Sequence, residues 1–575
     1  MSLLLSESTR LAGPVESLAI EPWFVSPASS PWAAELPEIP EEPSFLLQAR
    51  DLVENSPNSA TAHARLAQAA VAVGLPDEAR ESAARAGALA SEPGRLDSAA
   101  TLAAAQVLLA VGALADAKGL LEAMPVDNVS RSLLLARVAI TESRFGDALS
   151  LLEGVETREA CNTRGWILLE TRRFAEAVHT LRGLIRNYGQ SAVALTNLGY
   201  AYAAMGALAK AIAVTRQAQE IDPVSPSIAL NLVSYYRAIG DAKRALDEIQ
   251  EQQLRRPDDL RLVFVEADIR VEGEDVNGAE RALRRARTAR TWAEAPLMAR
   301  AELEANLTFV RWLLGRSTRV AARDELATQL RRTEFESLEI ARMLTPLFRD
   351  PDEMDELEEL CDALAVRHPK VAFLNLRSHL AMRRGDLQSA TDIALRWAEE
   401  SVFDPHAAGT AVFLLADIRG DYDRALAIGF PAVRRHPSSA PLVNNVAYTL
   451  TLAGRYNEAL RLIPTDPGAN VHLIATRALV DYLRGDSDAG HAGFQRAREV
   501  AEAHANTDDE LPDLVTYHEV VAMYRAARLG VLKGTDPNSV HLEFPVGWQT
   551  APALILMKAI ADREGIAVTA ASDGG

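Results

Sequence analysis

The chain has little of several residues that would narrow its function. It has 2 Cys, 6% aromatic residues, and only 6 Lys among its 60 basic residues. Two cysteines, Cys161 and Cys361, are too few and too far apart in sequence for a disulfide framework or a thiolate metal site. Because large rings are scarce, Ala and Leu must fill the interior. No cofactor is indicated.

Long apolar runs are also missing. No window approaches about 18 uninterrupted apolar residues, and the three leucines near the N-terminus follow no positive charge. We therefore expect neither a membrane span nor a signal peptide, and predict a soluble, cytoplasmic protein. The abundance of Ala and the preference for Arg over Lys indicate a GC-rich, bacterial genome.

The overall charge is acidic. With 79 Asp+Glu against 60 Lys+Arg the formal net charge is −19. This balance argues against a protein that coats nucleic acid or an anionic membrane by bulk charge.

Residues 1–55 differ from the rest of the chain. Prolines are dense there, alongside Trp23, Phe24 and Trp32 and the acidic run ELPEIPEE. Proline at that density prevents helix, so we expect this segment to be extended or disordered. Two interpretations stay open. The segment packs on the first helices as a tail, or it is a linear motif that docks into a partner or into this protein's own groove.

From about residue 56 the chain repeats itself. Six residues recur 34 positions later (231 − 197 = 34): Asn197, Leu198, Tyr202, Gly206, Ala211 and Pro223 return as Asn231, Leu232, Tyr236, Gly240, Ala245 and Pro257. This period is typical of stacked helix-turn-helix units. Within one unit, Leu195, Leu198 and Tyr202 form the apolar stripe of a first helix, and small residues on a second helix allow close approach.

These residues resemble the tetratricopeptide repeat family, which implies an all-α superhelix (solenoid) of helical hairpins. The small residue that opens each second helix can be followed from Ala79 to Gly490 in thirteen hairpins, with Ala321 and Leu357 assigned in the least regular part. The predicted regions are a Pro-rich segment at 1–55, repeats at 56–287, irregular helical repeats at 288–350, repeats at 351–510, and capping helices with a tail at 511–575.

No catalytic constellation is present. The sequence holds no phosphate-cradling GxxxxGK[ST], no GxGxxG after a strand and no GxSxG elbow. His518-Glu519 begins like a zinc-protease motif, but Ala522 stands where the second His ligand belongs. The acidic run around Met354 reads as a solvated helix face with Met354, Leu357 and Cys361 on its buried stripe. We predict no enzyme and no metal site.

The family resemblance implies protein or peptide binding on the concave face of the first helices. Carried onto this sequence, the binding positions are Asn162, Trp166, Thr196, Tyr200, Arg237, Asn375, His379, Asn444 and Tyr448. Their amide, ring and guanidinium groups suit an extended or helical peptide. The alternative is that Trp166 and Tyr200 merely pack between first helices. Position 5 never holds Lys, which puts the family's two-carboxylate clamp for chaperone tails in doubt.

One segment runs against the acidic background. Five arginines between residues 281 and 290 form a predicted basic ridge: Arg281, Arg284, Arg285, Arg287 and Arg290. Such a ridge suits an acidic partner, a phosphorylated segment or RNA, whereas a plain solvated face is the alternative.

Three functions follow. The first is a scaffold or adaptor that binds a partner protein or peptide. The second is a ligand- or peptide-responsive regulatory subunit that controls an enzyme or transcription factor. The third is an accessory subunit of a nucleic-acid or bacterial defence complex. The sequence does not identify the partner or the oligomeric state.

Overall fold

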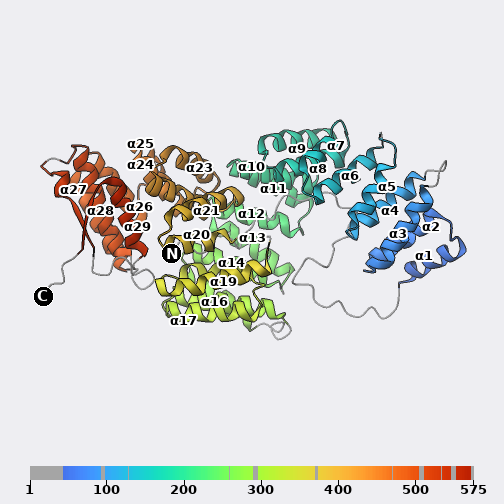
Figure 1. Cartoon of the computed structure of the whole chain (residues 1–575), viewed down its shortest axis with the longest axis horizontal. Helices are drawn as coiled ribbons and strands as arrows, with labels where there is room; N and C mark the ends of the chain where they lie inside the picture. Colours follow the sequence, from blue (N-terminus) through green and yellow to red (C-terminus); the bar gives the residue numbers. More distant parts are fainter. Residues whose placement is uncertain are drawn as a thin grey trace. The chain divides into compact units, whose positions relative to one another are not determined.

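The computed structural model describes residues 43–91, 97–126, 128–257, 259–288, 295–369, 373–468, 470–503, 511–532, 534–544 and 552–570. Most of the predicted Pro-rich segment 1–55 and the ridge residue Arg290 therefore lie outside the described residues. The described chain is almost entirely helical, with helices packed in antiparallel pairs (Figure 1).

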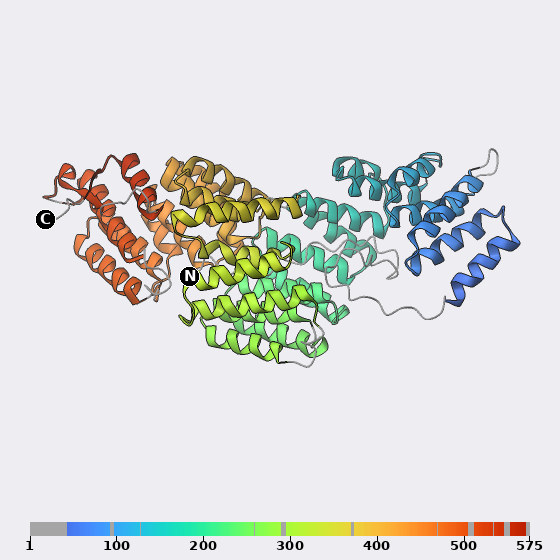
Figure 2. The same cartoon turned by 60° about the horizontal axis from the view of Figure 1, so that its bottom comes forward.

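The chain divides into two compact units. Among the described residues, unit 1 comprises 202–216 and 224–575, and unit 2 comprises the residues up to 201 together with 217–223. Each unit is a stack of helical hairpins (Figure 2).

The helices of the first half are α1 Ser44–Asn55, α2 Ala60–Ala72, α3 Pro76–Ala90, α4 Ser98–Ala110, α5 Leu114–Glu122, α6 Val129–Thr141, α7 Phe145–Leu151, α8 Arg158–Glu170, α9 Phe174–Tyr188, α10 Ala192–Ala204, α11 Leu208–Ile221, α12 Pro226–Ala238, α13 Ala242–Arg255, α14 Leu260–Glu272 and α15 Val276–Arg287. The second half has α16 Leu297–Leu313, α17 Arg319–Arg332, α18 Leu338–Leu344, α19 Met354–Arg367, α20 Leu374–Arg383, α21 Leu387–Glu400, α22 Pro405–Leu414, α23 Tyr422–Arg435, α24 Ala440–Leu452, α25 Tyr456–Leu462, α26 Val471–Leu483, α27 Ser487–Ala503, α28 Leu511–Arg528 and α29 Pro552–Glu564. Short 3₁₀ turns lie at Thr345–Leu347, Pro351–Glu353 and Pro537–Ser539, and a π-helical turn at Leu415–Arg419.

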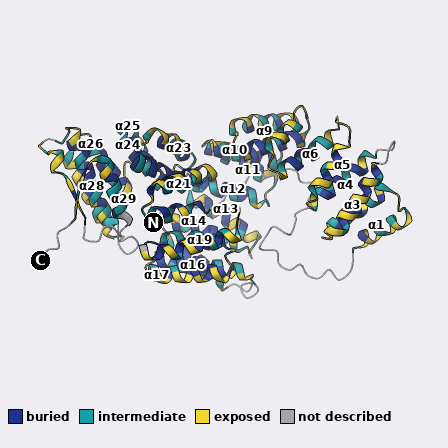
Figure 3. Ribbon diagram, viewed as in Figure 1, coloured by how far each residue is buried: buried dark blue, intermediate teal, exposed yellow. Residues whose placement is uncertain are grey.

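In the part of the chain described, thirteen hairpins run from α2–α3 to α26–α27, as the sequence predicts. The small residues that open the second helices are fully buried, for example Ala79, Ala211 and Ala459. Because these side chains are short, the two helices of a hairpin approach closely. Buried and exposed residues alternate along single helices, as expected for amphipathic elements (Figure 3).

The hairpin turn needs a left-handed backbone. Gly74, Gly206 and Gly240 take it with φ of 77°, 76° and 79°. Two other hairpins lack glycine there and place Ser143 (φ 58°) and Arg172 (φ 60°) in the same region. These side chains therefore bear a local conformational cost.

The irregular region around 288–350 is helical with uneven connections. The predicted small residue Ala321 is wrong by one position, because it is exposed and Ala322 is the buried one. Leu357 and the rest of the predicted stripe of α19 are buried as expected. The acidic face before α19 is not wholly solvated, however, since Glu353 is only 7% exposed.

The C-terminal region contains an element that the sequence analysis missed. Strands β1 (His541–Phe544) and β2 (Ala567–Ala570) pair in parallel, with His541 opposite Ala567, and α29 connects them. The predicted closing helices correspond to α28 and α29. Leu542 and Phe544 pack with Met557 of α29, so the small sheet extends the hydrophobic core at this end.

Candidate interaction face

The first helices of adjacent hairpins contact one another. In unit 1, α14 contacts α16, α16 contacts α18, α22 contacts α24, and α24 contacts α26. We call the layer that they form the inner layer. All nine predicted binding residues lie on its helices: four in unit 2, on α8 and α10, and five in unit 1, on α12, α20 and α24.

In unit 2, two of the four predicted residues are buried. Asn162 is 4% exposed and Thr196 1%, and the Thr196 hydroxyl donates to the carbonyl of Ala192 at 2.7 Å. Trp166 and Tyr200 are half-buried. The Trp166 ring packs edge-on against Phe145, with centroids 6.2 Å apart. Trp166 and Tyr200 thus have some surface for a partner, whereas Asn162 and Thr196 are packing residues in this structure.

In unit 1, Arg237 at the end of α12 is held by an ion pair. Its Nε lies 2.8 Å from Oε2 of Glu272 on α14, and its Nη2 contacts the other carboxylate oxygen. The side chain is only 8% exposed. Burial lowers the pKa of Arg237, but the charges of Glu272, Asp268 and Glu339 raise it above its ordinary value.

Asp268 on α14 is 6% exposed, and its Oδ2 has no hydrogen-bond donor in the described part of the chain. Burial and the charge of Glu339 raise the pKa of Asp268 well above its ordinary value, against the lowering effect of Arg237. While the carboxyl is ionised, such an oxygen is a costly, unsatisfied acceptor.

Glu302 on α16 continues this group. Its Oε1 accepts a hydrogen bond from the Ser337 hydroxyl at 2.8 Å. Burial raises the pKa of Glu302 to about 7, and the charge of Glu339 on α18 adds to this. Arg342 lies 3.7 Å from Glu339. We call Asp268, Glu272, Glu302 and Glu339 the carboxylate group. Three consecutive inner-layer helices supply its four carboxyls, and Arg237 and Arg342 are the guanidiniums paired with them.

The other predicted residues of unit 1 mostly serve the chain itself. The His379 ring lies 2.7 Å from the carbonyl of Phe348, and burial lowers its pKa to about 4. The Tyr448 hydroxyl donates to Oδ1 of Asp417 at 3.0 Å, and Asn444 accepts from the Thr476 hydroxyl at 2.7 Å. Tyr448 and Asn444 are buried, and Asn375 is half-buried.

The C-terminal helices complete this arrangement. Arg563 of α29 donates to the carbonyl of Ala416 and lies 3.7 Å from Asp417, which is fully buried. Arg525 of α28 pairs with Glu564 at 2.9 Å. Burial raises the pKa of Asp417 to about 6, and Arg525 and Arg563 oppose that rise. Tyr448 and Asp417 therefore anchor the C-terminal helices.

The predicted basic ridge is partly paired with carboxylates of the chain itself. Four of its arginines reach carboxylates: Arg281 pairs with Asp275 at 3.7 Å, Arg284 with Glu280 at 2.6 Å, Arg285 with Glu266 at 3.2 Å and Arg287 with Glu304 at 3.5 Å. Glu266 and Glu280 are almost fully buried. These pairs reduce the positive charge available to RNA or an acidic partner.

Among the described residues, no three His, Cys, Asp or Glu side chains are placed to hold a metal ion together. Nor does any described helix combine the length and apolarity that crossing a bilayer requires.

Comparison with known proteins supports the repeat assignment. Residues 192–225, which are 34 residues long, match the family model described as tetratricopeptide repeat. This part of the chain, which spans α10 and α11, is therefore a tetratricopeptide repeat. No curated protein matches its sequence.

Two solved structures are similar to this chain. One is a chain of the APC/C hetero-tetramer Cut9-Hcn1, with 16% identity and a TM-score of 0.42 over 81% of this chain and 93% of that one. The other is a tetratricopeptide repeat protein from Parabacteroides merdae ATCC 43184, with 14% identity and a TM-score of 0.32 over 52% of this chain and 98% of that one. Similarity at this level carries no information about function.

The repeat spacing locates one of the carboxylates that the sequence analysis missed. Asp268 precedes Ala279 by 11 residues, the same offset by which Tyr200 precedes Ala211. The repeat spacing of the sequence therefore places Asp268 at the same repeat position as Tyr200. Glu302 and Glu339 lie where the register is irregular, and only the structure places Glu339 near Arg237 and Asp268 and Glu302 near Glu339.

Proposed function

We propose that this protein is a cytoplasmic scaffold or adaptor that binds a segment of a partner protein on the inner layer of unit 1, in a binding rather than a catalytic role. The observation that supports this proposal is the carboxylate group, together with the unsatisfied Oδ2 of Asp268. A lysine or arginine of the partner would be attracted to these carboxyls and would favour their ionised forms. The proposed partner segment is therefore cationic.

Binding should be coupled to proton release. Because Glu302 has a pKa of about 7, it is partly protonated near neutral pH. An ammonium or guanidinium group favours the ionised form of a carboxyl. Affinity for a cationic segment should thus rise between pH 6 and pH 8.

The test uses fluorescent peptides of equal length, one rich in Lys and Arg and one rich in Glu, with fluorescence anisotropy on the full chain. We expect the cationic peptide to bind more tightly, and Glu302→Gln combined with Glu339→Gln to weaken it. The control is Glu359→Gln, an exposed position on α19. Equal binding of both peptides, or equal loss in the control, would contradict the proposal.

A further inference from the structure

Two segments of unit 1 that are far apart in sequence meet at the end of α12. The Ser438 hydroxyl, in the loop between α23 and α24, lies 2.8 Å from the carbonyl oxygen of Arg237 and 2.9 Å from that of Ala238. The Ser438 backbone N–H also donates to the Ala238 carbonyl at 3.2 Å. These carbonyls belong to the last turn of α12, where a helix supplies no donors four residues ahead, and the Arg237 carbonyl also accepts from the N–H of Gly240 at 2.9 Å.

Two hairpin turns complete the contact. A Cβ atom placed on Gly206 would lie 2.6 Å from Cβ of Arg434, and one placed on Gly240 would lie 3.2 Å from Cβ of Ser438. The turn glycines Gly74, Gly112, Gly154, Gly315 and Gly454 have nothing within 4 Å of such an atom. Gly206 and Gly240 thus share a positive φ with these glycines and differ from them in their close packing.

Apolar contacts support the same junction. Phe403, in the loop between α21 and α22, packs with residues of the two hairpins that carry Gly206 and Gly240: Tyr202, Leu208, Ala211, Tyr235 and Ala238. The helices from α12 to α23 form a continuous series of contacting hairpins. At this junction the loop that follows α23 contacts the end of α12, so a later part of the stack returns to an earlier part. Because the contact joins the first and the last helices of this series, it fixes the superhelical pitch of the hairpins between them.

Arg237 belongs to both the junction and the candidate site. Its backbone carbonyl accepts from Ser438, while its side chain pairs with Glu272 of the carboxylate group. A cationic partner that takes Glu272 would release the Arg237 side chain at the point where α12 is held.

We propose that the contact between the α12 end and the Arg434–Ser438 segment is a clasp that fixes the pitch of unit 1 and opens when a cationic segment binds to the carboxylate group. The clasp itself stands on the contacts above, whereas its opening rests on the proposed function. The clasp supplies the two-state element that a ligand-responsive regulatory subunit requires.

The experiment locks the clasp by a disulfide. In the full chain, Gly240→Cys is combined with Ser438→Cys, whose Cβ atoms need to shift by only a few tenths of an ångström to reach disulfide geometry. The native Cys161 and Cys361 are buried, so background oxidation is low. The probe is the cationic peptide used above, measured with the oxidised and the reduced protein.

We expect the disulfide to form readily without peptide and at least about fivefold more slowly with saturating peptide. We also expect the oxidised protein to bind the peptide at least about fivefold more weakly than the reduced protein does. Failure to crosslink would overturn the clasp. Normal crosslinking with equal binding in both redox forms would overturn its opening by the partner. If crosslinking proceeds but the peptide binds neither the oxidised nor the reduced form, the proposed function is wrong. The coupling between peptide binding and clasp opening is then wrong as well, whereas the clasp itself is confirmed.

A second pair of variants guards against a folding artefact. Gly206→Ala and Gly74→Ala place the same side chain at nearly the same φ, but only the former collides with Arg434. In the double-cysteine background, we expect Gly206→Ala to slow crosslinking about tenfold and Gly74→Ala to leave it unchanged. Equal rates in the two would show that Gly206 does not pack in the clasp.

Discussion

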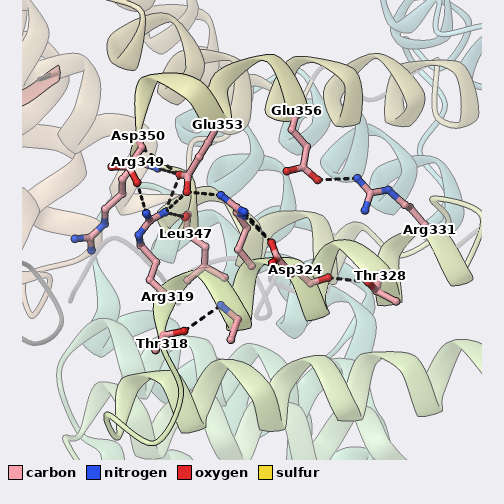
Figure 4. Close-up of polar contacts among 12 residues, drawn as sticks. Thr318, Arg319, Asp324, Thr328, Arg331, Leu347, Arg349, Asp350, Glu353 and Glu356 are labelled. Carbon is pink, nitrogen blue, oxygen red and sulfur yellow. Dashed lines mark hydrogen bonds and ion pairs between the residues drawn. The ribbon is translucent and has the colours of Figure 1, made fainter. Parts of the chain in front are cut away.

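Nη1 of Arg319 lies 2.9 Å and 2.7 Å from the two carboxylate oxygens of Glu353, in the least regular part of the repeat array (Figure 4). Arg323 contacts the same carboxylate, and the backbone N–H groups of Arg349 and Asp350 donate to it at 2.8 Å and 3.1 Å. Burial raises the pKa of Glu353, but these donors outweigh it and hold the pKa below the ordinary value. One buried acid thus joins α17 to the turn that precedes α19.

Replacing this acid should loosen the irregular region. We expect Glu353→Gln to cost about 3 kcal/mol of local stability, because Arg319 and Arg323 are left with one neutral acceptor. Hydrogen exchange over residues 297–367 measures it. The control Glu356→Gln removes a more exposed pair with Arg331 and should cost less than about 1 kcal/mol. Equal protection in both variants would show that Glu353 does not hold this region.

Glu302 should make the stability of unit 1 depend on pH. Its folded pKa of about 7 exceeds the ordinary value of 4.5, so the folded state binds more protons between these two values. Stability from this group is therefore present at low pH and is lost as pH rises from 4.5 through 7, by at most about 1.4 kcal/mol per pH unit. Denaturant unfolding of Glu302→Gln at several pH values should show a flatter profile than wild type. An unchanged slope would mean that Glu302 titrates normally.

A missing turn glycine offers a stabilising change. Ser143 adopts φ 58° between α6 and α7, where the preceding hairpin has Gly112 at φ 79°. Ser143→Gly should raise the free energy of unfolding by about 0.5–1 kcal/mol, because relief of the left-handed strain exceeds the entropy cost of glycine. Ser132→Gly inside α6 should instead lower it by about 0.5 kcal/mol. Chemical denaturation of both variants checks the sign, and a loss at position 143 would refute the strain.

The sequence was sufficient for the hairpins because their signal is local. A 34-residue period, a small residue and a turn glycine all lie within one unit. It was insufficient for Ala322, because uneven connections shift the register near 320 by one residue. The strands β1 and β2 were not predicted because each is only four residues long. Such short segments carry only a brief alternation of apolar and polar residues, and the pairing partner of each strand lies on the other side of α29 in the sequence.

The site was less predictable because charge partners come from neighbouring hairpins. The sequence predicts a basic ridge from the arginines at 281–287, yet Glu266 and Glu304, which pair with two of them, belong to other helices. Tyr448 had the right repeat position for a binding residue, but Asp417 already occupies its hydroxyl. The same kind of non-local placement brings Glu339 near both Arg237 and Glu302.

The hairpin register has a direct test at Ala211. This residue is fully buried and packs with Leu208 and Tyr235 beside the clasp. Ala211→Leu should cost about 1–3 kcal/mol, because the added atoms have no space between the helices. Ala213 lies two residues further along the same helix and is exposed. Ala213→Leu should therefore change the free energy of unfolding by less than about 0.5 kcal/mol. Denaturation midpoints of the two variants provide the comparison, and equal midpoints would mean that Ala211 does not form the close contact of this hairpin.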